Sequence, residues 1–245
     1  MTEFAQLAPS GHLARVMERL DSAARAAGRD PVDIGLVAVS KYHPAEAIAA
    51  LAEAGQTRFG ESYADEGIAK MAALADHALE WHFVGPIQSN KTRRIAEHFH
   101  WVHGIEREKI ARRLSDQRPE ALGPLPVCLQ VNLSGEASKA GCDPEELPAL
   151  ARTVATLPRL RLRGLMTLPA PTSDPAEQRR PFARLRALLA SLRTDLVEAG
   201  LVDAEQLDTL SMGMSGDLEA AVAEGATLVR VGTDLFGPRP ANGAG

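Results

Sequence analysis

The side chain with the clearest chemical potential is an amine that follows a buried apolar run. Lys41 comes directly after the sequence LVAVS and before His43 and Pro44, so it lies at the end of the strand predicted for 34–39. A lysine that is partly desolvated there can have a lowered pKa and attack an aldehyde as an amine nucleophile. Because most lysines that follow strands are solvated, Lys41 alone is a weak indication of such a nucleophile, and the interpretation depends on other residues as well.

A second group of residues, small or hydroxyl-bearing, has the composition of an anion-binding loop. Residues 211–217, SMGMSGD, lead from a predicted strand into a predicted helix. Small residues there let backbone N–H groups approach an anion closely, and the hydroxyls of Ser211 and Ser215 add donors beside the positive end of the helix. Gly232 and Thr233 supply similar groups after the last predicted strand. Taken alone, Ser215 is better explained as a helix N-cap.

Arg230 lies within the last predicted strand. Alternation of side chains along that strand puts Leu228, Arg230 and Gly232 on one face and the two neighbouring valines on the other. If Arg230 points into the interior it needs a partner, because an unpaired buried guanidinium is costly. An ion pair with an acidic residue of a neighbouring strand is the alternative to a role at a ligand site.

The histidines and cysteines do not form a metal-binding pattern. His98, His100 and His103 span a predicted helix end and a short strand, so we expect their side chains to diverge, and no acidic or thiol ligand accompanies them at zinc spacing. We therefore expect no metal site. Cys128 and Cys142 are too few for a disulfide framework and are interpreted as reduced thiols in or near the core.

Short strand-like runs alternate with amphipathic segments along the chain. The eight predicted strands are 34–39, 56–59, 81–84, 100–103, 126–132, 160–165, 207–211 and 227–231. We expect His82 and Trp81, in the third of them, to line the barrel.

Apolar spacing and end signals predict the helices between these strands. Leu13, Val16, Met17 and Leu20 share one face of a first helix that Gly28 can stop. Pro44 begins the next helix and Gly55 ends it, and Ser62 with Asp65 resembles a capping box for the third. Further helices are predicted at about 88–98, 106–116, 144–156, 177–199 and 216–224.

Repeated strand-helix units predict a parallel sheet, because a parallel pair needs a crossover long enough for a helix. Eight units in 245 residues suit a single (β/α)₈ barrel of the TIM type, an α/β fold that we assign to 1–245 as one domain. The tail FGPRPANGAG predicts no helix after the last strand. The N-terminal helix at 10–27 then completes the outer ring. Functional groups are expected at the carboxyl ends of the strands, where Lys41 lies.

Composition excludes several classes of partner. The formal net charge is −5 and the pI is about 5.8, which gives no basic surface for nucleic acid or anionic lipid. No run approaches about 18 apolar residues and the N-terminus does not resemble a secretory signal, so we expect a cytoplasmic protein without a membrane span. No second domain is visible, which favours a monomer.

Several segments together resemble the YggS-type pyridoxal phosphate homeostasis family, also called the proline synthase co-transcribed homologue family. The resemblance spans about 34–238. The matching residues are Ala38 to Lys41, Phe59 to Glu61 with Tyr63, His82 to Lys91, Val131 and Asn132, Glu136, Ser138 and Lys139, Gly141, Arg163 to Met166 with Pro169, Ser211 to Ser215 with Asp217, and Val229 to Thr233. The elements HFxGxxQxNK and SMGMS are the most specific. Ser62 is a departure, since the family usually has Asn there.

The resemblance implies a barrel like the N-terminal domain of alanine racemase that holds pyridoxal 5'-phosphate as a Schiff base on Lys41. By the same comparison, Ser211, Ser215, Gly232 and Thr233 would hold the phosphate, Arg230 would face the pyridine nitrogen, and Met166 would line the ring pocket. Position 62 is left out of this set.

The resemblance implies a role in vitamin B6 homeostasis, with enzymes that need the cofactor as recipients. An arginine at the pyridine nitrogen weakens the electron sink that transamination requires. We therefore expect no efficient turnover and assign no catalytic residue. The alternatives are a racemase or lyase of low activity that uses the cofactor, and a phosphate-binding barrel enzyme that does not.

Overall fold

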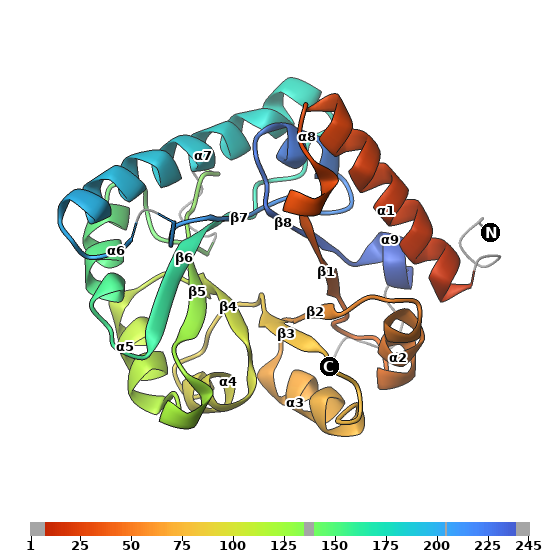
Figure 1. Ribbon diagram of the computed structural model, residues 1–245, viewed down its shortest axis with the longest axis horizontal. Helices are drawn as coiled ribbons and strands as arrows, with labels where there is room; N and C mark the ends of the chain where they lie inside the picture. Colours follow the sequence, from red (N-terminus) through yellow and green to blue (C-terminus); the bar gives the residue numbers. More distant parts are fainter. Residues whose placement is uncertain (1–7, 135–139, 204, 239–245) are drawn as a thin grey trace.

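The computed structural model describes residues 8–134, 140–203 and 205–238. Glu136, Ser138 and Lys139, which contribute to the resemblance, lie outside them. The described strands form a closed parallel barrel in chain order (Figure 1). They are β1 (Gly35–Val39), β2 (Arg58–Glu61), β3 (Glu80–Phe83), β4 (Trp101–Ile105), β5 (Leu125–Gln130), β6 (Leu160–Met166), β7 (Thr209–Ser211) and β8 (Leu228–Val231). The predicted barrel is confirmed.

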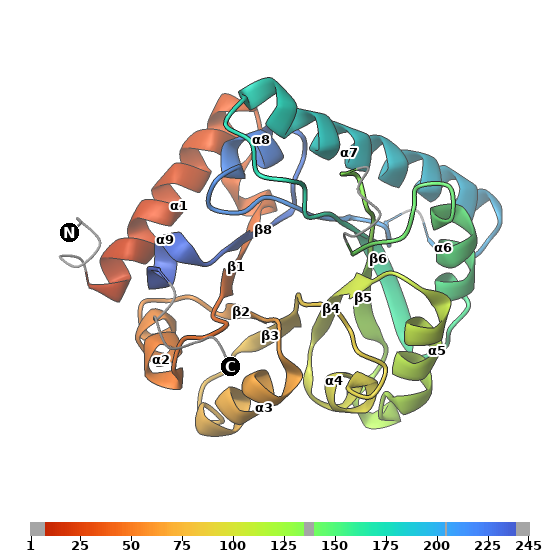
Figure 2. The same ribbon diagram turned by 180° about the vertical axis from the view of Figure 1, so that it is seen from behind.

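Helices surround the barrel, as both views show (Figures 1 and 2). They are α1 (Pro9–Ala26), α2 (Ala45–Glu53), α3 (Ala64–Ala73), α4 (Thr92–His98), α5 (Glu108–Gln117), α6 (Leu147–Ala155), α7 (Pro175–Glu198), α8 (Leu218–Ala223) and α9 (Thr233–Phe236), with short 3₁₀ turns at Pro31–Asp33 and Glu120–Leu122. Each strand is thus followed by a helix before the next strand begins. The long loop before α7 belongs to the mouth where the strands end.

The N-terminal helix lies where the outer ring would otherwise be open. α1 contacts α2, α8 and α9, and it buries Leu13, Val16 and Leu20. The expectation that no helix follows the last strand was wrong, because residues 233–236 form the single turn α9. Gly237, with a φ of 86°, ends that turn. α9 is too short to cover the barrel alone, so α1 covers this sector.

Two local predictions fail for identifiable reasons. Met17 is 39% exposed, because it lies at the edge of the α1 face that carries the buried leucines. The capping box at Ser62 and Asp65 is absent: α3 begins at Ala64, its N-cap is Tyr63, and Asp65 pairs instead with Lys91 and Arg94. The signals at Pro44, Gly28 and Gly55 are confirmed at the ends of α1 and α2.

Side-chain alternation divides the buried residues into two layers. Leu36, Val102 and Leu165 belong to the large apolar cluster between the strands and the helices. Val37 and Met166 alternate with members of that cluster and are completely buried outside it, so they fill the barrel interior.

The barrel interior also holds polar groups. His82, His103, Ser211 and Arg230 are each at most 4% exposed, and each adjoins residues of the outer apolar cluster in its strand. His82 therefore lines the interior as expected, whereas Trp81 points the other way and packs against Phe59, with ring centroids 5.9 Å apart. Two neighbours in one strand cannot share a face.

The buried histidines predict a loss of stability in mild acid. Burial lowers the pKa of His82 and, further, that of His103, so both stay neutral where exposed imidazoles take up protons. Below the ordinary value of 6.5, the unfolded chain binds more protons than the folded protein. The free energy of unfolding is expected to fall by up to about 1.4 kcal/mol per pH unit for each histidine.

Urea unfolding at a series of pH values from neutral to mildly acidic measures this slope. His103→Gln is expected to flatten it, whereas replacing the exposed His98 by Ala leaves it unchanged. A wild-type stability that is constant or rises as the pH falls below 6.5 would contradict neutral burial of these histidines.

Candidate functional site

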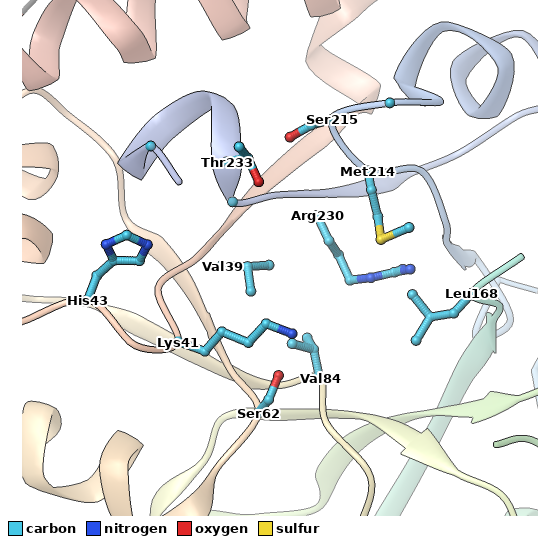
Figure 3. Close-up of a pocket in the computed structure, with 13 residues that line it drawn as sticks. Val39, Lys41, His43, Ser62, Val84, Leu168, Met214, Ser215, Arg230 and Thr233 are labelled. Carbon is cyan, nitrogen blue, oxygen red and sulfur yellow. The ribbon is translucent and has the colours of Figure 1, made fainter. Parts of the chain in front are cut away.

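A cavity of about 250 Å³ opens among the carboxyl ends of the strands. It is lined by Val39, Lys41, His43, Ser62, Val84, Leu168, Met214, Ser215, Gly216, Arg230, Gly232, Thr233 and Gly237. Figure 3 shows Lys41 and Arg230 both reaching into it, with Ser215 and Thr233 on the side away from Ser62. One small space is thus lined by an amine, a guanidinium and three hydroxyls.

Lys41 occupies a tight turn after β1. His43 N–H donates to Ser40 O at 3.0 Å, and Tyr42, next to Lys41, has a φ of 68°. A residue other than glycine rarely adopts this left-handed conformation, which costs energy that the surroundings must supply. The Tyr42 N–H donates to Glu66 Oε1 at 2.6 Å. This bond holds the turn in the form that directs Lys41 into the cavity.

A buried cluster of charged side chains stabilises the same turn. Lys70 Nζ donates to Ser40 O at 2.8 Å, to Glu61 Oε1 at 2.8 Å and to Glu66 Oε1 at 2.6 Å. Ser40 Oγ also donates to Glu61 Oε1, at 2.6 Å. Burial raises the pKa of Glu61, and Lys70 opposes that shift. Sequence reasoning missed this cluster, although the i, i+4 spacing of Glu66 and Lys70 on a predicted helix was visible.

The loop after β7 is shaped by a glycine and a carboxylate. Gly213 has a φ of 94°, and a Cβ there would lie 2.5 Å from the Cβ of Ala221. Asp217 Oδ1 accepts from Met214 N–H at 2.5 Å, and Asp217 is also the N-cap residue of α8. The alternative that Ser215 is the N-cap is therefore wrong, and its side chain lines the cavity instead.

Gly232 and Thr233 lie where β8 turns into α9. A Cβ on Gly232 would lie 3.1 Å from Val39 O, so the glycine lets the two chain segments approach closely. Thr233 is the first residue of α9 and lines the cavity. This places the ends of β1 and β8 on adjoining walls, as the parallel pairing of these strands requires.

Arg230 is held by uncharged partners. Its Nη1 donates to Ser211 Oγ at 2.7 Å and its Nη2 donates to Thr167 O at 3.0 Å. Among the residues that the structure describes it forms no ion pair, so the alternative of an acidic partner on a neighbouring strand is wrong. Burial lowers the pKa of Arg230 to about 10, and Asp217 opposes this shift. The guanidinium remains charged at neutral pH.

The seven residues that the resemblance assigns to the cofactor separate into two groups. Lys41, Ser215, Arg230, Gly232 and Thr233 line one cavity. Ser211 and Met166 do not line it, since both are completely buried in the barrel interior, where Ser211 bonds to Arg230. Their direct contact with a ligand stays a prediction.

The structure adds cavity residues that the sequence did not assign to the ligand. Val39, His43, Val84, Leu168 and Met214 also line it. Each lies at or just after the end of a strand, which is the signal that could have found them. The His43 ring stacks on Phe236 with centroids 5.0 Å apart, and burial lowers its pKa.

The three histidines considered for a metal do diverge. His98 Nδ1 contacts Arg94 O, His100 Nδ1 accepts from Trp81 N–H, and His103 lies inside the barrel. In the described part of the chain, no three histidine, cysteine or acidic side chains are grouped to hold a metal ion. Cys128 and Cys142 are free and buried, as expected, and burial raises the pKa of each thiol to about 12.

No described helix is both long enough and apolar enough to cross a membrane.

Comparison with known proteins defines the class to which this barrel belongs. The family of alanine racemase N-terminal domains matches residues 12–240. An alanine racemase from Corynebacterium glutamicum has the same fold, with a TM-score of 0.65 at 17% identity over 94% of this chain and 62% of that chain.

More similar proteins narrow this class. The pyridoxal phosphate homeostasis protein of Pseudomonas aeruginosa is 60% identical over 228 residues, which are 93% of this chain and 94% of that protein. The protein of the same name from Escherichia coli K12 is 49% identical over 231 residues, or 93% of this chain and 95% of that protein. The chain therefore belongs to the pyridoxal phosphate homeostasis protein family.

A solved structure of the same family carries the ligand. PipY of Synechococcus elongatus with bound pyridoxal phosphate has a TM-score of 0.77 and 42% identity, covering 91% of this chain and 100% of that chain.

Proposed function

We propose that this protein binds pyridoxal 5'-phosphate in the cavity at the carboxyl ends of the strands and thereby serves intracellular vitamin B6 homeostasis. The observation that carries the proposal is the convergence of Lys41, Arg230, Ser215 and Thr233 on one cavity. The ligand has an aldehyde, a pyridine nitrogen and a phosphate, and each has a chemical counterpart there. Family membership and the bound ligand of PipY support the same assignment.

Lys41 is the residue proposed to bond the ligand. Its amine would attack the aldehyde carbon, and loss of water would leave a Schiff base. When bound, the cofactor supplies an electron-withdrawing ring and a reactive imine carbon. The half-buried position of Lys41 and the left-handed turn at Tyr42 present the amine to the cavity.

The phosphate is assigned to the wall formed after β7 and β8. Ser215 and Thr233 offer hydroxyl donors, and Gly232 leaves the backbone open to close approach. Loops after the seventh and eighth strands form the recurrent phosphate site of such barrels. Ser211 is hydrogen-bonded to Arg230, and its direct contact with the phosphate stays a prediction.

Arg230 is assigned to the pyridine nitrogen. A guanidinium with a pKa of about 10 keeps its proton at neutral pH and would donate a hydrogen bond, leaving the ring nitrogen unprotonated. An unprotonated ring withdraws electrons weakly, which opposes catalysis that needs a carbanion. We therefore assign the protein a binding and delivery role, with enzymes that require the cofactor as recipients.

The cytoplasm is the proposed site of action, and two free buried cysteines suit a reducing compartment. The recipients and the expected monomer stay predictions.

A slow racemase or lyase is the second candidate, and His43 is the observation that favours it. His43 lines the cavity with Lys41, and burial lowers its pKa, so the neutral ring could accept a proton. Tyr42 and Tyr63 are weaker candidates than His43 for the group that exchanges a proton with the substrate. Their hydroxyls are hydrogen-bonded to each other, and neither residue lines this cavity.

Turnover of a panel of D- and L-amino acids by the protein loaded with pyridoxal phosphate separates the two candidates. We expect no racemisation, elimination or transamination near the ordinary enzyme range of about 1 s⁻¹ or more. Turnover in that range, lost in both Lys41→Ala and His43→Ala, would establish the second candidate and contradict the first.

A further inference from the structure

A row of hydrogen bonds runs through the barrel interior from one end to the other. Glu80 Oε1 lies 2.7 Å from His82 Nε2, and His82 Nδ1 lies 2.9 Å from His103 Nε2. His103 Nδ1 lies 2.7 Å from Ser211 Oγ, which accepts from Arg230 Nη1 at 2.7 Å. We call these five groups the interior relay. They come from β3, β4, β7 and β8.

The two ends of the interior relay reach different cavities. Arg230 lines the cavity that contains Lys41, at the carboxyl ends of the strands. Glu80 and His82 line a second cavity, of about 590 Å³, formed by residues at the amino ends of the strands, including Arg58 and Trp101. Glu80 is partly exposed there and pairs with Arg58 at 3.3 Å. The relay therefore spans the barrel.

The middle of the interior relay is closed to water. His82 is 1% exposed, and His103 and Ser211 are completely buried. Burial lowers the pKa of both histidines, so each ring carries one proton and has one donor and one acceptor nitrogen at neutral pH. The pKa of Glu80 is lowered, chiefly by its bond to His82, so its carboxylate is ionised.

The ends then fix the direction of every bond. A carboxylate only accepts, so His82 Nε2 must carry the proton and His82 Nδ1 must accept. His103 Nε2 must therefore donate, which leaves His103 Nδ1 as an acceptor. Ser211 must give its single hydroxyl proton to that nitrogen.

At the other end a guanidinium only donates. The oxygen of Ser211 accepts from Arg230, which agrees with the direction set by Glu80. In all four hydrogen bonds the donor is therefore on the Arg230 side and the acceptor is on the Glu80 side. At no point in the row does a donor face a donor or an acceptor face an acceptor.

We infer that Glu80, His82 and His103 are positioning residues for Arg230. They fix the direction of the Ser211 hydroxyl, and this hydroxyl in turn holds the guanidinium. With that hydroxyl proton committed to His103, the oxygen always offers a lone pair to the guanidinium. Without the row, His103 can take the other tautomer and donate through Nδ1 to Ser211 Oγ. The hydroxyl proton then loses its acceptor and competes with the guanidinium donor for space around the same oxygen. The expected effect on cofactor binding rests on the proposed function above, whereas the bond directions do not.

Nitrogen-15 NMR of histidine side chains in the protein without cofactor tests the directions. At neutral pH, His82 and His103 are both expected to carry the proton on Nε2 and none on Nδ1. The signals are assigned by their loss in His82→Asn and His103→Asn. A proton on Nδ1 of either ring, or a doubly protonated ring, would overturn the inference.

Two variants at the distant end test the positioning. Glu80→Leu removes the acceptor, so we expect mixed tautomers at both histidines and an affinity for pyridoxal phosphate lower by about tenfold, the worth of one hydrogen bond to a charged group. Glu80→Gln keeps an acceptor oxygen and should restore both readouts. His100→Asn, a change in the same region outside the relay, should alter neither.

Unchanged tautomers and affinity in Glu80→Leu would overturn the inference, as would an equal loss in the Leu and Gln variants. If the wild type shows the expected tautomers but binds no pyridoxal phosphate, the proposed function fails while the bond directions stand. The two failures are therefore distinguishable.

Discussion

Replacing Lys41 by alanine is expected to abolish the visible absorption band that wild-type protein acquires with pyridoxal phosphate. The band reports the Schiff base, and no other lysine lines the cavity among the described residues. The turn that carries Lys41 is held by the backbone of Ser40 and Tyr42 through Lys70 and Glu66, so the variant should keep its fold. Absorption and circular dichroism spectra measure both outcomes.

Lys91→Ala is the matched control. Lys91 is another lysine after a strand, but it pairs with Asp65 on the surface at 2.6 Å and lies outside the cavity. It should retain the full band. Persistence of the band in Lys41→Ala, or its loss in Lys91→Ala alone, would show that the assigned amine is the wrong one.

The double change of Ser215 and Thr233 to alanine is expected to weaken binding of pyridoxal phosphate strongly. Each hydroxyl is assigned one hydrogen bond to a charged phosphate oxygen, and each loss costs about 1 to 3 kcal/mol, so the dissociation constant is expected to rise by roughly one and a half to four orders of magnitude. Fluorescence or absorption titration measures it. Thr194→Ala, on the exposed side of α7, serves as the control.

Pyridoxal, which lacks the phosphate, completes this experiment. Wild-type protein should bind it far more weakly, and the double variant should bind it about as well as wild type does, because the lost donors have no partner on this ligand. Equal affinity of the wild type for the two aldehydes would remove the phosphate site from the account.

The barrel was predictable because its signals are local. Alternating apolar runs and end signals such as Pro44 and Gly55 depend on residues within a few positions of each other. The predictions were wrong where a contact between residues far apart in the sequence determines the ends or the presence of an element. β2 begins two residues later than predicted, and the side chain of Gln56, just before it, donates to Leu36 O of β1. The turn α9 forms against α1, whose position the sequence of the tail does not encode.

The site was predictable only in part, for a related reason. Alternation along β8 correctly placed Arg230 on the face opposite its two valine neighbours, because that property needs one strand alone. Only the closed barrel shows that this face is the interior. Its partners Ser211 and Thr167 depend on how β6, β7 and β8 stand beside each other, which the sequence does not state. The left-handed conformation of Tyr42 was equally hidden, since no glycine or asparagine marks it.

Borohydride reduction followed by peptide mapping tests the central claim most directly. Reduction converts a Schiff base into a stable secondary amine, so the pyridoxyl group stays on the lysine that held it. Wild-type protein incubated with pyridoxal phosphate should carry one pyridoxyl group, on the peptide that contains Lys41. A pyridoxyl group on Lys70, Lys91 or Lys139 instead, or no labelled peptide at all, would contradict the account.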